Sequence, residues 1–179
     1  MSNIMEFFTS VNTEPMKFIA QIIGIIPLCI SYFMFLYTDR KKIITAKTVS
    51  DMLWALHFVL LGEVAGSITN VINIFRDIVF YHKDKIRVNN RLIPILFCII
   101  TIVFTSLSGD GVRCIFPMVG SCLAVIGFWC SDSNKIRSFN FAALSLWLVY
   151  GIITCSISTI IGNCLGLFSI ISRWIKDKK

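Results

Sequence analysis

The chain has 179 residues, of which 56% are hydrophobic and only 15% are charged, and its mean hydropathy is +0.78. A soluble domain usually carries about a quarter charged residues, so this composition excludes a soluble globule and predicts a protein embedded in the lipid bilayer. The formal net charge of +7 does not indicate nucleic acid as a partner. The basic residues stand in short clusters between long apolar runs, as they do in the cytoplasmic loops of membrane proteins.

Long apolar runs follow one another along the chain, separated by short polar segments. We predict helices over 18–37, 48–61, 64–81, 92–107, 112–130, 139–154 and 156–175. Strands are not expected, because an open sheet edge finds no hydrogen-bond partners in lipid. The predicted fold class is therefore an all-α integral membrane protein with seven transmembrane helices. Residues 1–16 lack the basic stretch of a cleavable signal peptide and are expected to form a segment outside the cytoplasm.

The distribution of basic residues predicts the orientation. With the N-terminus outside, fourteen of the seventeen Lys and Arg residues fall on the cytoplasmic side, Lys17 and Arg113 fall outside, and Arg76 lies within a helix. Cytoplasmic loops carry such an excess. An even number of helices would put both termini on one side and spoil the asymmetry. We therefore expect a multi-pass protein of the inner membrane with its C-terminus in the cytoplasm.

An internal repeat relates residues 38–86 to residues 131–179 by a shift of 93. Trp54 matches Trp147 and Asn70 matches Asn163, and these identities are more informative than apolar matches in a membrane protein. The repeat predicts three helices in 17–85, a linker helix in 86–110 and three helices in 111–179. A single linker helix keeps both halves in the same orientation, which is a parallel repeat.

This 3+1+3 plan resembles the SWEET and PQ-loop transporter superfamily and, more closely, the YgjV family of bacterial inner-membrane proteins. The stretches that carry the resemblance are Ala20–Gly24, Leu56–Gly62 and Asn73–Arg76, and it covers about residues 17–179. The literal Pro-Gln motif is absent, since Gln21 follows Ala20. SWEET-type relatives are sugar uniporters, so the resemblance implies a carrier of a small, sugar-like solute.

In SWEET-like carriers, a Trp on the second helix and an Asn on the third line the sugar pocket from both repeats. Sixteen residues separate Trp54 from Asn70, and also Trp147 from Asn163. An amide both donates and accepts hydrogen bonds with hydroxyl groups, and an aromatic ring packs on the CH face of a sugar. The alternative is that the Asn residues bond between helices and the Trp residues only pack.

Further polar residues fall near these four. Asn73 lies one helical turn after Asn70, and His57 aligns with Tyr150 in the repeat. His57 could be linked to a proton or could simply bond a neighbour. The predicted substrate-binding set is Trp54, His57, Asn70, Asn73, Trp147, Tyr150 and Asn163.

A charged pair is predicted as a gate at the inner mouth. Asp51 is expected near the cytoplasmic start of its helix and Arg76 near the cytoplasmic end of the next, so a hairpin brings them to similar depth. Asp77 is the competing partner, and the alternative is that Arg76 reaches the lipid headgroups. Pro27 and Pro117 lie inside helices and could mark either a hinge or a static kink.

No pattern in the sequence predicts catalysis. The His and Cys residues lack metal-ligand spacing, and there is no nucleophile–base set or phosphate-binding loop. We expect no enzyme activity, no cofactor and no metal. The favoured function is a carrier of a small polar solute by alternating access, as a monomer or homo-oligomer. The alternative is a membrane protein that does not transport and serves as a sensory or partner-binding subunit.

Overall fold

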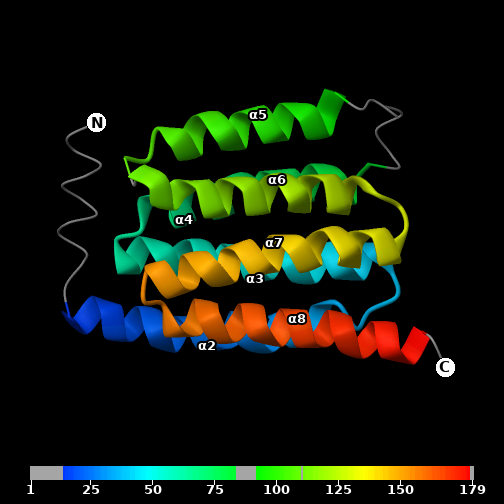
Figure 1. Cartoon of the computed structure of the whole chain (residues 1–179), viewed down its shortest axis with the longest axis horizontal. Helices are drawn as coiled ribbons and strands as arrows, with labels where there is room; N and C mark the ends of the chain where they lie inside the picture. Colours follow the sequence, from blue (N-terminus) through cyan, green and yellow to red (C-terminus); the bar gives the residue numbers. More distant parts are fainter. Residues whose placement is uncertain (1–13, 84–91, 110, 178–179) are drawn as a thin grey trace.

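The computed structural model describes residues 14–83, 92–109 and 111–177, and every regular element in these ranges is helical. The elements are, in chain order, α2 (Glu14–Met34), α3 (Arg40–Leu61), α4 (Val64–Tyr81), α5 (Leu92–Ser106), the 3-10 turn η1 (Gly111–Cys114), α6 (Ile115–Trp129), α7 (Ser133–Ile153) and α8 (Ile157–Asp177). The helices lie side by side and alternate in direction along the chain (Figure 1). The all-helical prediction is confirmed for the described residues.

Three helices begin earlier than the hydropathy of the sequence predicts: α2 at Glu14 instead of residue 18, and α3 and α7 by larger margins. The expected starts at residues 48 and 139 are replaced by Arg40 in α3 and Ser133 in α7. Each of these last two helices is capped by an aspartate: the side chain of Asp39 accepts a hydrogen bond from the Lys41 amide, and that of Asp132 accepts one from the Asn134 amide. The charged first turns end the apolar run but not the helix, which is why hydropathy misplaced both boundaries.

Six helices form a closed ring. Each helix packs against the next in the order α2, α3, α4, α6, α7, α8, and α8 packs against α2 to close the ring. The helix α5 lies outside this ring, against α4 and α6, at one edge of the molecule (Figure 1). The loops between α2 and α3 and between α6 and α7 meet at the same end of the ring as the C-terminus of α8. We call it the basic end, because it holds Arg40, Lys41, Lys42, Lys83, Lys135, Arg137, Arg173 and Lys176.

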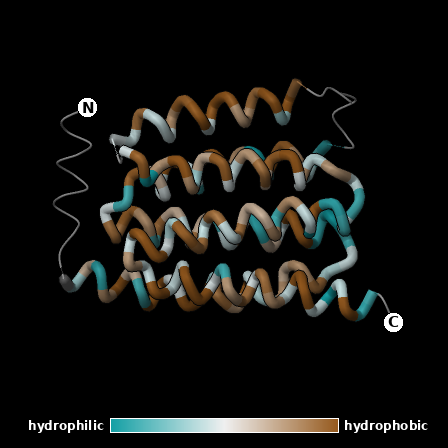
Figure 2. Tube along the Cα trace, in the orientation of Figure 1, coloured by the Kyte–Doolittle hydropathy of each residue, from teal (hydrophilic) through white to brown (hydrophobic). Residues whose placement is uncertain are grey.

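The polarity of the molecule is inverted relative to a soluble protein. Large apolar side chains are exposed around the ring, among them Phe18 (69%), Phe75 (62%) and Phe168 (58%), whereas Asp51, Arg76 and many other polar side chains are buried. Figure 2 shows the apolar residues spread along the helices and the polar ones gathered largely at the end that carries the C-terminus. Such a surface is stable only against lipid.

Five helical segments are long and apolar enough to cross a membrane. They are Pro15–Met34, Arg40–Leu61, Gly111–Trp129, Ser133–Ile153 and Ile157–Asp177. The helix α5 is apolar but has only 15 residues. The helix α4 is not among the five because it carries polar and charged side chains, and these are buried inside the ring rather than facing outward. The chain is therefore a membrane protein with several spanning helices.

Candidate functional site

A small cavity of about 50 Å³ lies at the centre of the ring, and each of the six ring helices contributes to its wall. Its volume is well below the roughly 300–1,000 Å³ of small-molecule pockets. The residues that line it are Ser31, Met34, Lys47, Ser50, Asp51, Trp54, Phe58, Asn70, Asn73, Ala124, Asn140, Ala143, Leu144, Trp147, Thr159, Gly162 and Asn163.

Five of the seven residues predicted to bind substrate line this cavity. They are Trp54 on α3, Asn70 and Asn73 on α4, Trp147 on α7 and Asn163 on α8. The spacing of 16 residues that the sequence analysis singled out therefore brings both Trp–Asn pairs to one place.

Many lining positions fall into pairs separated by 93 residues, the shift of the internal repeat. The pairs are Ser31 with Ala124, Lys47 with Asn140, Ser50 with Ala143, Asp51 with Leu144, Trp54 with Trp147, and Asn70 with Asn163. Equivalent positions of the two halves of the chain thus face the same space. The side chains differ at four of the six pairs, so the wall is asymmetric and its charge lies on the first half.

Three lining asparagines share one geometry. The amide nitrogens of Asn70, Asn140 and Asn163 each donate to the backbone carbonyl four residues earlier on their own helix, over 2.8 Å in each case. The amide nitrogen has two protons and the amide oxygen only accepts. Each asparagine therefore retains its amide oxygen as an acceptor and the second amide proton as a donor.

The aromatic part of the wall consists of three rings. Phe58 lies between Trp54 and Trp147, with ring centroids 6.0 and 5.9 Å away. Two glycines make room for the indoles: a Cβ at Gly162 would lie 2.9 Å from Cζ2 of Trp54, and one at Gly120 would lie 3.0 Å from Cδ1 of Trp147. The indoles are thus held against bare backbone, which fixes their faces relative to the cavity.

His57 and Tyr150, the other two predicted residues, lie behind the aromatic rings and do not line the cavity. Both are fully buried. His57 Nδ1 lies 2.8 Å from the Ala20 carbonyl and Nε2 lies 2.9 Å from the Ser156 hydroxyl, so each ring nitrogen has a protein partner. This geometry favours the bonding alternative for His57 over contact with a solute.

Tyr150 makes the equivalent link in the second half. Its hydroxyl accepts a hydrogen bond from the Gly66 amide at 3.2 Å and donates to Glu63 Oε2 at 3.4 Å. Tyr150 follows His57 by 93 residues, and Ser156 follows Glu63 by 93 residues. The end of α3 is therefore joined to the start of α8, and the end of α7 is joined to the start of α4. Both links lie at the end of the ring opposite the basic end.

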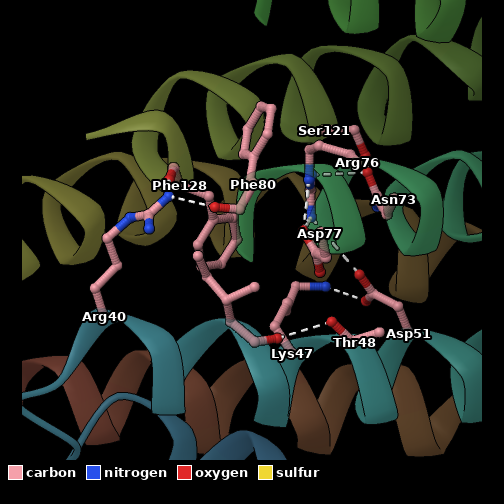
Figure 3. A network of polar contacts seen from close by, with 11 residues as sticks. Arg40, Lys47, Thr48, Asp51, Asn73, Arg76, Asp77, Phe80, Ser121 and Phe128 are labelled. Carbon is pink, nitrogen blue, oxygen red and sulfur yellow. Dashed lines mark hydrogen bonds and ion pairs between the residues drawn. The ribbon is translucent and has the colours of Figure 1, made fainter. Parts of the chain in front are cut away.

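A cluster of four charged side chains adjoins the cavity on one side (Figure 3). Lys47 pairs with Asp51 one turn later on α3, and Arg76 of α4 contacts Asp77 through Nη2 at 2.6 Å and Nε at 2.7 Å. Arg76 also donates to Asn73 at 2.8 Å. Two cations and two carboxylates cancel in net charge, which lowers the cost of burying them. We call Lys47, Asp51, Arg76 and Asp77 the charge cluster.

The predicted contact between Asp51 and Arg76 exists, and the competing partner Asp77 is closer. Arg76 Nη2 lies 3.7 Å from Asp51 Oδ2, farther than from Asp77, so Asp77 holds the guanidinium. All three side chains are fully buried, and their role as a gate stays a prediction. The early start of α3 places Asp51 well inside that helix. Asp51 is the twelfth residue of that helix, roughly 16 Å from its first residue.

At the basic end, an arginine at the start of α3 bonds to the end of α6, and an arginine at the start of α7 bonds to the end of α2. Arg40 donates to the Phe128 and Cys130 carbonyls at 3.3 and 3.1 Å. The corresponding bonds from Arg137 reach the carbonyls of residues 35 and 37, at 3.1 and 2.8 Å. These acceptors pair by the same shift of 93. Arg40 also donates to the Phe80 carbonyl of its own half at 2.8 Å, a bond that Figure 3 shows. A cation that satisfies the last carbonyls of a helix stabilises its C-terminus.

Lys47 and Asn140 are among the lining residues that sequence reasoning missed. Lys47 was assigned to a cytoplasmic loop because its helix was expected to begin at residue 48, whereas Asn140 fell inside the expected helix 139–154 and was not singled out. The shift of 93 relates them to each other, so a search for polar residues at matched positions, identical or not, would have found them. Arg40 and Arg137 were counted only toward the positive charge of loops, although both have bonding partners inside the ring.

The described residues include no group of three His, Cys, Asp or Glu side chains that could hold a metal ion. Neither a curated protein nor a solved structure matches the chain. A family model described as a bacterial inner membrane protein, Imp-YgjV, matches residues 18–179. The match covers nearly the whole chain, including every residue of the cavity wall, and the chain therefore belongs to the YgjV family of bacterial inner membrane proteins.

Proposed function

We propose that this protein is a carrier that moves a small polar, sugar-like solute across the inner membrane by alternating access. In this proposal α2–α4 and α6–α8 are two parallel repeats, residues 17–85 and 111–179, joined by a linker helix in 86–110. All seven helices cross the membrane, with the N-terminus outside and the basic end in the cytoplasm. The proposal follows the SWEET-like plan that the sequence resembles.

One observation carries the proposal: the cavity is lined at matched positions of the two halves, and contacts between the halves close it at both ends. The bonds of Arg40 and Arg137 cross between halves at the basic end, and those of His57 and Tyr150 cross at the opposite end. A carrier needs two such sets of contacts, because one must break while the other holds. In this proposal the structure is the occluded state, and the contacts at both ends support it.

The α4 helix supports the proposal although its composition is polar. Its buried side chains include Asn70, Asn73, Arg76 and Asp77. Ionisable residues within a membrane usually face a cavity or one another and mark a solute or ion pathway. Here Asn70 and Asn73 face the cavity and the two charged residues face each other.

Uptake into proteoliposomes tests the proposal. Purified protein is reconstituted and offered labelled sugars and other small polar metabolites, with and without a pH gradient. We expect uptake by the wild type and its loss in Asn70→Ala and in Asn163→Ala, since each removes an amide from the cavity wall. Val71→Ala and Cys164→Ala are matched controls, because each lies beside one of the asparagines and is exposed.

A non-transporting role is the second candidate, and the size of the cavity favours it. A volume of about 50 Å³ holds no sugar without movement of the helices. A sensory or partner-binding subunit would keep this closed form and tolerate alanine at both asparagines. The absence of uptake of every solute from well-folded protein, with and without a pH gradient, would favour this role over the carrier.

A further inference from the structure

The cavity wall is chemically one-sided. Among the described residues that line it, Lys47 and Asp51 are the only charged ones, and they are paired with each other. The three asparagine oxygens accept hydrogen bonds, and the serine and threonine hydroxyls can either donate or accept. Apart from Lys47, which is paired with Asp51, the wall carries one charge, the Asp51 carboxylate, beside neutral groups that can accept hydrogen bonds.

The aromatic rings reinforce this preference. Trp54, Phe58 and Trp147 lie next to one another on the cavity wall, with neighbouring ring centroids 6.0 and 5.9 Å apart. An aromatic face carries negative electrostatic potential, and Trp attracts a cation most strongly of the three ring types. Carboxylate, amide oxygens and rings are together the groups that recognise an ammonium ion.

Asp51 retains capacity for another hydrogen-bond donor. Its Oδ1 atom pairs with Lys47, whereas Oδ2 is buried and has no hydrogen-bond partner among the described residues. Arg76 does not fill that position: its Nη2 atom is 3.7 Å from Oδ2, because Asp77 and Asn73 hold the guanidinium. A buried carboxylate oxygen left in this way favours a ligand that brings its own N–H groups.

Lys47 already places an ammonium group on this carboxylate. Its side chain is 15% exposed whereas that of Asp51 is fully buried, so Lys47 is the partner that can leave toward solvent at the basic end. The equivalent position in the other half is the neutral Asn140. A lysine tethered one helical turn from Asp51 would neutralise the carboxylate whenever no ligand is bound, and would give way to a ligand of the same charge.

We propose that the cavity binds a protonated amine, whose ammonium group displaces Lys47 from Asp51. The proposal rests on the carrier function above and narrows its substrate class to solutes that carry an amino group. Exchange of one ammonium for another leaves the charge cluster neutral in both states, so the buried carboxylate is never left without a counter-charge.

The experiment compares glucosamine with glucose, which differ by one amino group. Uptake of each labelled compound is measured in proteoliposomes, and the shift of the thermal unfolding midpoint that each causes is measured in detergent. The test variant is Lys47→Gln with Asp51→Asn, which removes the pair without leaving a single charge behind. The matched control is Arg173→Gln with Asp177→Asn, an ion pair of the same i,i+4 type at 2.9 Å that does not line the cavity.

We expect the wild type and the control to prefer glucosamine, and the test variant to lose that preference. We also expect Lys47→Gln alone to bind glucosamine about tenfold more tightly, if Lys47 holds Asp51 for about nine-tenths of the time in the wild type. Equal uptake of both compounds by the wild type and the test variant would overturn the amine proposal and leave the carrier function standing.

The binding measurement separates the two proposals if no uptake occurs. A rise of the unfolding midpoint with glucosamine but not glucose, present in the wild type and absent in the test variant, would support the amine site while the carrier function fails. No shift with either compound, together with no uptake, would overturn both.

Discussion

The Nε2 atom of His57 lies 2.9 Å from the hydroxyl of Ser156, although 99 residues separate them in the chain. The reciprocal positions in the repeat make the same kind of contact, from Tyr150 to Glu63. Different side chains thus make two equivalent contacts, one between the end of α3 and the start of α8 and the other between the end of α7 and the start of α4. The contacts are equivalent although the residue types at these four positions differ.

Tyr150→Phe tests this link. The change keeps the buried ring and removes the hydroxyl, so the Gly66 amide loses its acceptor and Glu63 loses a donor. We expect the free energy of unfolding to fall by about 1–2 kcal/mol, seen as a lower thermal unfolding midpoint in detergent. Tyr37→Phe is the control, since that side chain is exposed. Equal midpoints for both variants would show that the bonds of Tyr150 contribute nothing to stability.

A cross-link at the basic end tests whether the two halves separate there. The Ser133 hydroxyl donates to the Thr38 carbonyl over 2.7 Å, which joins the start of α7 to the α2–α3 loop. In a variant without the native cysteines, Thr38→Cys with Ser133→Cys should form a disulfide on oxidation and stop solute uptake, because the basic end can no longer open. A reducing agent should restore uptake.

The cysteine-free parent, oxidised in the same way, is the control for this cross-link. Uptake that continues at the parent's rate after the disulfide has formed completely would contradict opening between these two positions.

Arg76→Gln should be the most damaging single change in the charge cluster. It leaves Asp77 buried without its cation, and breaking a buried pair on one side costs about 3–5 kcal/mol. Arg76→Lys should not restore stability, because an ammonium cannot reproduce the guanidinium bonds to Asp77 and Asn73. Arg76→Gln with Asp77→Asn removes charge in balance and should recover most of the loss. The measurement is the thermal unfolding midpoint, and a double variant less stable than Arg76→Gln would refute this account.

Gly162→Ala should reduce solute uptake strongly and the free energy of unfolding moderately. The added methyl group would lie 2.9 Å from both Trp54 Cζ2 and Leu28 Cδ2, so the indole must move toward the cavity. We expect a cost of about 1–3 kcal/mol in stability and a marked fall in uptake of any transported solute. The exposed neighbour Ile161, changed to alanine, serves as the control. Uptake equal to that of the control would show that the position of Trp54 is not critical.

The orientation is tested by fusions to the C-terminus. Basic residues gather at the end of the ring where α8 finishes, and such residues remain on the cytoplasmic side. We expect a fluorescent protein fused after Lys179 to fluoresce and a fused alkaline phosphatase to be inactive. The opposite pair of results would invert the topology while leaving the fold unchanged.

Local chemistry in the sequence was sufficient to predict the helices and part of the site. Apolar runs predicted the helical class and most helix bounds, with α4 matching over 64–81. The prediction that the two Trp–Asn pairs lie together also agrees with the structure, because all four residues line one cavity. Predictions of this kind need only the period of a helix and the shift of a repeat.

The sequence by itself determined that the chain is a helical membrane protein and that Trp54, Asn70, Trp147 and Asn163 belong together. Tertiary structure alone decided the rest. Hydropathy could not show that α3 begins at Arg40 and so carries Asp51 and Lys47 inward, because an aspartate cap extends a helix beyond its apolar run. Nor could it show which side of a helix His57 occupies. Polar side chains are buried or exposed according to the neighbouring helices, and those neighbours come from the other half of the chain.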